Sequence, residues 1–129
     1  MRLILALLAL IPTPSSAQDP SEGADLFVSY CATCHGLEAR GDGPMAPILT
    51  ILPADLSRIS ERNGGAFPTL RVARQIDGRD PLLAHGGQMP VFGNLFSDQV
   101  VAIPGPGGQP IMVSQSIADI MAWLQTVQE

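Results

Sequence analysis

The chain has 129 residues and a formal charge of −5 at pH 7, with seven Lys and Arg residues against twelve Asp and Glu. This length suits a single domain, because domains cluster near ~100–150 residues. The acidic balance and the complete lack of lysine argue against nucleic acid as a partner, since binding a phosphate backbone requires clustered basic side chains. Gly (13) and Pro (12) are abundant and aromatic residues make up only 5%. The sequence therefore predicts many turns and few large side chains to fill a core.

The first 17 residues have the pattern of a secretory signal peptide. Arg2 precedes an unbroken apolar run over Leu3–Ile11, and small residues follow up to Ala17. An uncleaved anchor is the alternative, but this run covers about 14 Å as a helix, roughly half of the ~30 Å hydrocarbon core. We therefore expect cleavage after Ala17, export to the periplasm, and a mature domain of residues 18–129 without a transmembrane span. Loss of Arg2 leaves a formal charge of −6.

The first half of the mature chain predicts one helix followed by a long loop. Apolar residues recur at helical spacing over residues 21–34, and Ser21 is a plausible N-cap. Frequent Gly and Pro indicate a loop over residues 36–53. A short helical turn is expected over residues 55–60.

The second half predicts two more helices and a hairpin. A helix over residues 68–77 begins with a proline in its first turn and stops at Gly78. A Gly/Pro turn joins two short strands expected over residues 100–103 and 111–113. Ser116 and Asp119 resemble a capping box. They precede an amphipathic terminal helix bordered by Trp123, whose apolar face consists of Ile117, Ile120, Met121, Leu124 and Val127. The predicted fold class is one small all-α domain with long loops.

Both cysteines lie in the motif CATCH, where Cys31 and Cys34 are followed directly by His35. A zinc site needs about four N or S ligands, and the chain offers two Cys and two His, with His85 remote from the others. A structural disulfide with a two-residue spacer would close too small a loop to constrain the unfolded chain. A thioredoxin-like redox pair is expected in a βαβ context, whereas this pair ends a predicted helix. The pattern C-x-x-C-H is typical of covalent haem attachment, with the thiol-redox pair as the next alternative.

The spacing of this motif has a physical reason. Two thiols three residues apart on a helical turn can both reach the vinyl groups on one edge of a haem and form thioethers. His35 then directs its imidazole toward the iron. The bound macrocycle would also supply the core volume that this chain lacks, so we expect folding and haem binding to be coupled.

Beyond this motif, nearly all of the mature sequence resembles class I c-type cytochromes. Gly23 and Phe27 lie eight and four residues before Cys31, and Ile120 and Trp123 lie in the terminal helix. In that family, small and aromatic residues at such positions let the first helix cross the last one closely. The resemblance implies an all-α, cytochrome c-like fold with small helices and long Gly/Pro-rich loops around one covalently attached haem c.

The family also has a loop whose proline carbonyl accepts a hydrogen bond from the proximal histidine. The segment Gly41-Asp42-Gly43-Pro44 resembles this loop, which makes Pro44 the candidate acceptor. Pro47 is a second candidate, and an ordinary turn proline is the alternative to both. Such a bond would fix the orientation of the imidazole ring and make it a stronger electron donor.

A second axial ligand would complete the coordination of the iron. Met89 precedes Pro90, as in the M-P ligand motif of the family, and adjacent glycines permit close backbone approach. His85 is the main rival, because imidazole binds iron well. Spacing alone does not exclude Met112. Two other methionines are weaker candidates, one on the proximal loop and one in the terminal helix: Met45 and Met121.

These features predict an electron carrier and not an enzyme. The residues of the site would be Cys31, Cys34, His35, Pro44 and Met89, with His35 and Met89 on the iron. We expect periplasmic redox proteins as donor and acceptor, and a monomer or a subunit of a redox complex. The alternatives are an open-site haem sensor for a gas or peroxide, a haem subunit of an oxidoreductase complex, and a thiol–disulfide protein.

The charge of the chain departs from that of mitochondrial cytochromes c, which carry a lysine-rich rim. An acidic carrier should meet a basic patch on its partner or rely on a small apolar contact. The arginines over residues 71–79 could pair a haem propionate or form a solvated helix face.

Overall fold

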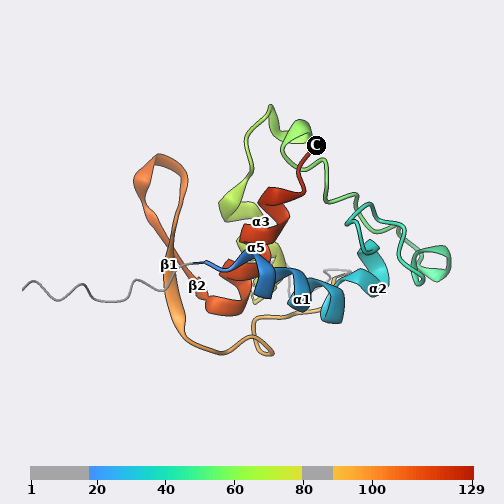
Figure 1. Ribbon diagram of the computed structural model, residues 1–129, viewed down its shortest axis with the longest axis horizontal. Helices are drawn as coiled ribbons and strands as arrows, with labels where there is room; N and C mark the ends of the chain where they lie inside the picture. The colour runs from blue at the N-terminus through green and yellow to red at the C-terminus, as the bar shows by residue number, and fades with distance from the viewer. Residues whose placement is uncertain (1–17, 80–88) are drawn as a thin grey trace, which may run out of the picture.

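The computed structural model describes residues 18–79 and 89–129. The fold is mostly helical, with one two-stranded antiparallel sheet (Figure 1). Its helices and strands are α1 (Pro20–Tyr30), α2 (Ala32–His35), α3 (Thr69–Asp77), β1 (Val100–Pro104), β2 (Pro110–Ser114) and α5 (Gln115–Thr126). Three short 3₁₀ turns are η1 (Ala46–Ile48), η2 (Glu61–Asn63) and η3 (Pro106–Gly108). No helix within the described ranges is long and apolar enough to cross a membrane.

The first and last helices cross in close contact. A Cβ atom on Gly23 would lie 2.0 Å from the carbonyl oxygen of Asp119, so only glycine lets the two backbones approach this far. One turn later the ring of Phe27, 1% exposed, lies with its centroid 4.3 Å from that of Trp123. Ile120 is also buried at this crossing. The predicted pairing of these residues between α1 and α5 is confirmed.

The start of α1 differs from the prediction. The N-cap is Asp19 and not Ser21: the Asp19 carboxylate accepts hydrogen bonds from the backbone N–H groups of Ser21 and Glu22. Pro20 occupies the first turn, where no intrahelical N–H bond is required. The helix predicted over residues 21–34 is also divided, because α1 ends at Tyr30 and α2 follows after one residue.

The start of α5 differs as well. Its N-cap is Ser114, whose hydroxyl accepts from the N–H of Ile117 at 3.3 Å. The predicted capping box is wrong because its two members bind elsewhere. Ser116 donates its hydroxyl to Asp98 at 2.7 Å, and the Asp119 carboxylate accepts from the backbone N–H of Asp19 at 2.8 Å. The N-terminus of α1 is thereby tied to α5.

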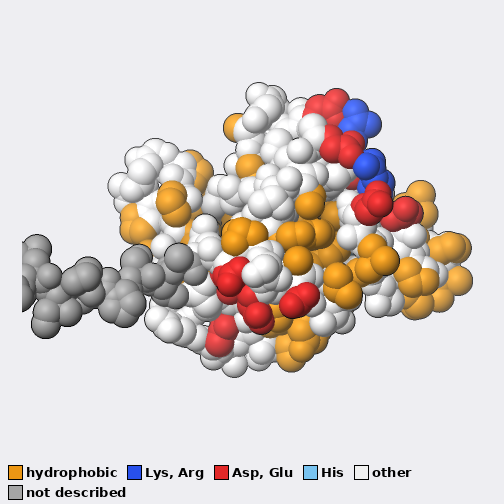
Figure 2. All heavy atoms as spheres, viewed as in Figure 1, with side chains coloured by type: hydrophobic (Ala, Val, Ile, Leu, Met, Phe, Trp, Pro, Cys, Tyr) orange, Lys and Arg blue, Asp and Glu red, His pale blue; other side chains and the backbone are white. Residues whose placement is uncertain are grey.

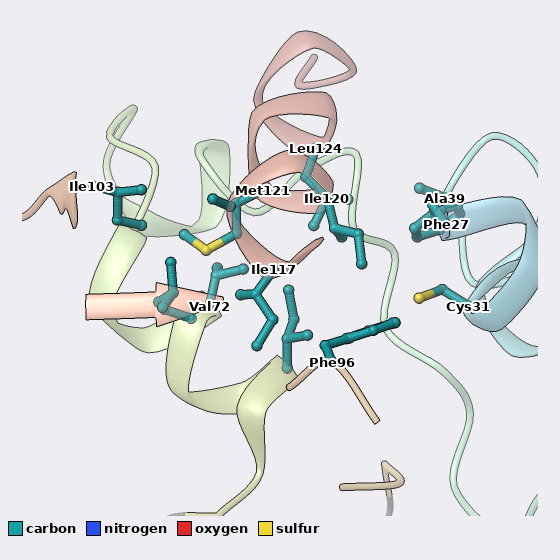
Figure 3. Packing of buried hydrophobic residues seen from close by; sticks show 14 of the residues in the cluster. Phe27, Cys31, Ala39, Val72, Phe96, Ile103, Ile117, Ile120, Met121 and Leu124 are labelled. Atoms are coloured by element: carbon teal, nitrogen blue, oxygen red, sulfur yellow. The ribbon is translucent and has the colours of Figure 1, made fainter. Parts of the chain in front are cut away.

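The structure confirms the helix and the hairpin that were predicted between α1 and α5. Helix α3 begins at Thr69, with Pro68 as its N-cap and not inside its first turn, and it ends at Asp77 before Gly78, which has a left-handed φ of 68°. Strands β1 and β2 pair antiparallel across the Gly/Pro turn and contribute buried Ile103 and Val113 to the core. Figure 3 shows the cluster of buried side chains between α1, α3 and α5, with the sulfur of Cys31 pointing toward it.

We predict that Gly23→Ala lowers the free energy of unfolding by about 2 kcal/mol, because the added Cβ overpacks the helix crossing. Alanine favours a helix by about 1 kcal/mol over glycine, but a backbone carbonyl of α5 cannot move aside. Chemical denaturation measures the difference. Ser29→Ala, at an exposed position of the same helix, is the matched control and should change stability by about 0.5 kcal/mol or less. Equal effects of the two substitutions would contradict the close crossing.

Candidate functional site

A cavity lies between α1, α3 and α5, and most of its wall is apolar. Its large hydrophobic side chains come from all three helices and from the segment before η2: Phe27, Leu56, Ile59, Val72, Ile120 and Leu124. These residues belong to the buried cluster or pack against it. Such a wall excludes water from whatever occupies the cavity.

Three of the five predicted site residues line this one cavity: Cys31, His35 and Met89. Cys31 is 7% exposed and lies between α1 and α2, which turns its thiol inward. Cys34 is partly exposed in α2 and does not line the cavity. The structure thus brings the CATCH segment together with a methionine that is 54 residues further along the chain than His35.

The ring of His35 is held by a backbone carbonyl, but not by the predicted one. Its Nδ1 lies 3.0 Å from the carbonyl oxygen of Ala54, and Pro44 is exposed on the loop after α2. The hydrogen-bond acceptor is therefore Ala54 and not Pro44. The second candidate, Pro47, lies in η1. With Nδ1–H donating to Ala54, the other ring nitrogen carries the lone pair and is free to bind a metal.

The loop that follows α2 does not supply the predicted acceptor for the His35 ring. It instead forms hydrogen bonds to the backbone of the CATCH segment. Gly41 donates its N–H to the carbonyl of His35 at 2.8 Å, and Gly43 donates to that of Cys34 at 3.1 Å. A Cβ on Gly43 would lie 2.5 Å from the carbonyl oxygen of Thr33. The glycines of the Gly41-Asp42-Gly43-Pro44 segment therefore matter for close packing against α2.

The Cys31 thiol does not have the properties of the nucleophile of a redox pair. Both cysteines are free, and burial together with the neighbouring Cys34 raises the pKa of the Cys31 thiol to about 11. Reactive thiols in disulfide exchange have a lowered pKa, because the thiolate is the nucleophile. Across the part of the chain that the structure describes, no three Cys, His, Asp or Glu side chains form a group that could hold a metal ion.

The methionines occupy different environments. Met89 is partly buried, packs against the core cluster and lines the cavity. Met121 is fully buried inside the core, whereas Met112 on β2 is 62% exposed and Met45 is 37% exposed. Within residues 18–79 and 89–129, Met89 alone among them lines the cavity. The rival ligand His85 lies outside the described residues.

Polar residues also line the cavity, and one of them, Arg71, belongs to the arginine cluster over residues 71–79 that the sequence suggested for a haem propionate. Arg62, Arg71 and Gln75 line it together with the apolar wall. Arg79, from the same predicted arginine cluster, instead pairs with Asp77 at 2.7 Å and lowers the pKa of that carboxyl. Helical spacing could have identified Arg71 and Gln75 as neighbours on α3, but not the cavity that they face.

The model of the Cytochrome c family matches residues 20–128. The chain therefore belongs to the Cytochrome c family, whose members bind haem c covalently and transfer electrons. Neither the curated proteins nor the solved structures contain a significant match.

The residues of the cavity fit such a haem. Cys31 is a free thiol on the cavity wall and Cys34 is a second one three residues away. The imidazole of His35 has one nitrogen available, and the remaining lining is largely apolar but includes two arginines, Arg62 and Arg71. This donor set matches a large hydrophobic ligand that carries iron at its centre and carboxylates at its edge.

We predict that Gly41→Ala disturbs the bond between His35 and Ala54. A Cβ on Gly41, whose φ is 80°, would lie 2.5 Å from the carbonyl oxygen of Pro53 and 3.1 Å from the carbonyl carbon of Ala54. The substitution should lower the free energy of unfolding by about 2 kcal/mol more than a control substitution that introduces the same backbone strain but no close contact. NMR should also show faster solvent exchange of the His35 Nδ1 proton.

Gly64→Ala supplies this control, because Gly64 has a similar φ of 69° and nothing lies within 4 Å of its added Cβ. Equal losses of stability and equal proton exchange in both variants would show that the segment at Ala54 does not depend on Gly41.

Proposed function

We propose that this protein is an exported, single-haem electron carrier. Residues 1–17 would be removed as a signal peptide, and residues 18–129 would form the periplasmic cytochrome domain. Cys31 and Cys34 would attach the haem, and His35 and Met89 would be its axial ligands. Redox proteins would be its donor and acceptor, either by diffusion or within a complex.

One observation carries this proposal: Cys31, His35 and Met89 line the same apolar cavity. His35 and Met89 come from segments far apart in the sequence, and only the packing of α1, α3 and α5 brings them together. Imidazole and thioether are the axial pair of cytochromes c with raised reduction potential. Membership of the Cytochrome c family supports the same assignment.

When bound, the haem supplies one-electron chemistry between Fe(II) and Fe(III). The protein's own residues orient the histidine and exclude water. The Ala54 carbonyl holds the His35 ring in one tautomer and increases its donor strength. Phe27, Ile120 and Leu124 keep water out, so little solvent has to reorganise when charge changes inside the cavity.

Covalent attachment provides the first test. Mature protein produced in a host that assembles c-type cytochromes should give a c-type pyridine haemochrome spectrum, and acid–acetone should not extract the haem. Cys31→Ser combined with Cys34→Ser should make any bound haem extractable. Ser29→Ala is the matched control, because it lies in α1 but outside the cavity. Fully extractable haem in the unmodified protein would contradict the proposal.

The sixth ligand provides the second test. Ferric protein should show the weak red charge-transfer band of sulfur coordination, and Met89→Ala should abolish it. Met112→Ala should leave the band intact, since Met112 is exposed on β2. Retention of the band in Met89→Ala would assign another ligand. Rapid binding of carbon monoxide by the unmodified reduced protein would instead favour an open-site sensor.

A further inference from the structure

The carbonyl that holds the His35 ring belongs to an irregular segment of the backbone. Residues 54–60 lie between η1 and η2 and form a stretch of bends and turns. The carbonyl oxygen of Ala54 lies 3.0 Å from Nδ1 of His35, and both Ala54 and Leu56 line the cavity. The direction of the Ala54 carbonyl is therefore fixed by contacts that other parts of the chain make with this segment.

The side chain of Gln128, just after α5, makes such contacts. Its Nε2 donates hydrogen bonds to the carbonyl oxygens of Leu56 at 2.9 Å and Leu124 at 2.7 Å. Its Oε1 accepts a hydrogen bond from the backbone N–H of Ser60 at 2.9 Å. The amide thus uses its nitrogen only toward acceptors and its oxygen toward a donor, which fixes its orientation. Gln128 therefore joins the last turn of α5 to the irregular segment at two points, Leu56 and Ser60.

A buried backbone group holds the same segment from its other side. The carbonyl oxygen of Ala39, which is 0% exposed, accepts a hydrogen bond from the N–H of Leu56 at 2.6 Å. Leu56 is thus held at its N–H by Ala39 and at its carbonyl by Gln128. Because Leu56 is only two residues from Ala54, these two contacts restrict the direction in which the Ala54 carbonyl points.

Ion pairs near the C-terminus constrain this segment less than Gln128 does. Arg40 pairs with Glu129, and Arg58 pairs with Glu61. Figure 2 shows basic and acidic side chains side by side in the region where Figure 1 marks the C-terminus. These side chains are about half exposed, so water screens their attraction. Gln128 is partly buried, where hydrogen bonds are stronger than in water.

We propose that Gln128 is a positioning residue for the histidine ligand of the haem iron. This inference rests on the proposed function, in which His35 is that ligand. By holding Leu56, Gln128 keeps the Ala54 carbonyl directed at Nδ1 of His35. A well-aligned bond from Nδ1–H makes the imidazole a stronger electron donor, which favours Fe(III) over Fe(II). Gln128 therefore lowers the reduction potential from outside the cavity, which it does not line.

An apolar side chain of similar size at position 128 tests this role. Gln128→Leu removes the three hydrogen bonds but keeps the backbone bond from Glu129 to Ser57 at 2.9 Å, so the variant should fold and mature. In redox titrations of the holoprotein, its reduction equilibrium should shift about threefold toward Fe(II), a rise of about 30 mV in potential. In NMR spectra of the reduced holoprotein, the Nδ1 proton of His35 should exchange with solvent faster than in the unmodified protein.

Gln125→Leu is the matched control, because Gln125 is exposed in the last turn of α5. This substitution should change neither the reduction potential nor the exchange of the His35 proton. If Gln128→Leu lowers stability but leaves the potential and the proton exchange unchanged, its role is structural alone and the proposal is overturned. Equal shifts of the potential in the two variants would overturn it as well.

Gln128→Glu decides the outcome if Gln128→Leu fails to mature. Its carboxylate retains an acceptor for the N–H of Ser60 but has no N–H to donate to Leu56. The His35 Nδ1 proton should exchange faster in this variant than in Gln125→Glu, which adds the same charge near the end of α5. Equal exchange in the two variants would refute the proposal. Absence of covalently attached haem in the unmodified protein would instead refute the proposed function, and this inference with it.

Discussion

The close crossing of α1 and α5 is the constraint on which the rest of the structure depends. Gly23 allows the α1 backbone to reach the carbonyl of Asp119, and the carboxylate of the same Asp119 holds the N–H of Asp19. This contact fixes the position of α1 against α5, and Cys31 follows directly after α1. A cavity wall made from both helices follows, because Phe27 and Ile120 meet at the crossing and also line the cavity.

Much of this arrangement could be predicted from local sequence. The CATCH motif, the stop of α3 at Gly78 and the hairpin around the Gly/Pro turn all depend on residues close together in the chain. The partners of the α1–α5 crossing were predicted too, although they are far apart, because they are part of the family resemblance. The two N-caps were not. Asp19 and Ser21 are both good capping residues, so local sequence does not decide between them. Asp119 accepts a hydrogen bond from Asp19, a residue far away in the chain, which local spacing does not reveal.

Some residues of the site could be predicted from the sequence and others could not, because a sequence shows side-chain chemistry but not which groups are neighbours in space. Side chains with distinctive chemistry, such as Cys31 and His35, are visible in any sequence. The acceptor for the His35 ring is a backbone carbonyl, which every residue carries, and it lies 19 residues away at Ala54. Only the fold determines which carbonyl arrives there. The arginines of α3 are similar, because only the fold determines that Arg71 lines the cavity and Arg74 does not.

We propose that His35 and Met89, which come from two distant segments of the chain, bind the same iron. Iron K-edge X-ray absorption of the ferric holoprotein tests this proposal most directly, since sulfur and nitrogen neighbours scatter differently. We predict five nitrogen atoms and one sulfur atom around the iron. Six nitrogen or oxygen neighbours and no sulfur would contradict the claim and leave the cavity without its second ligand.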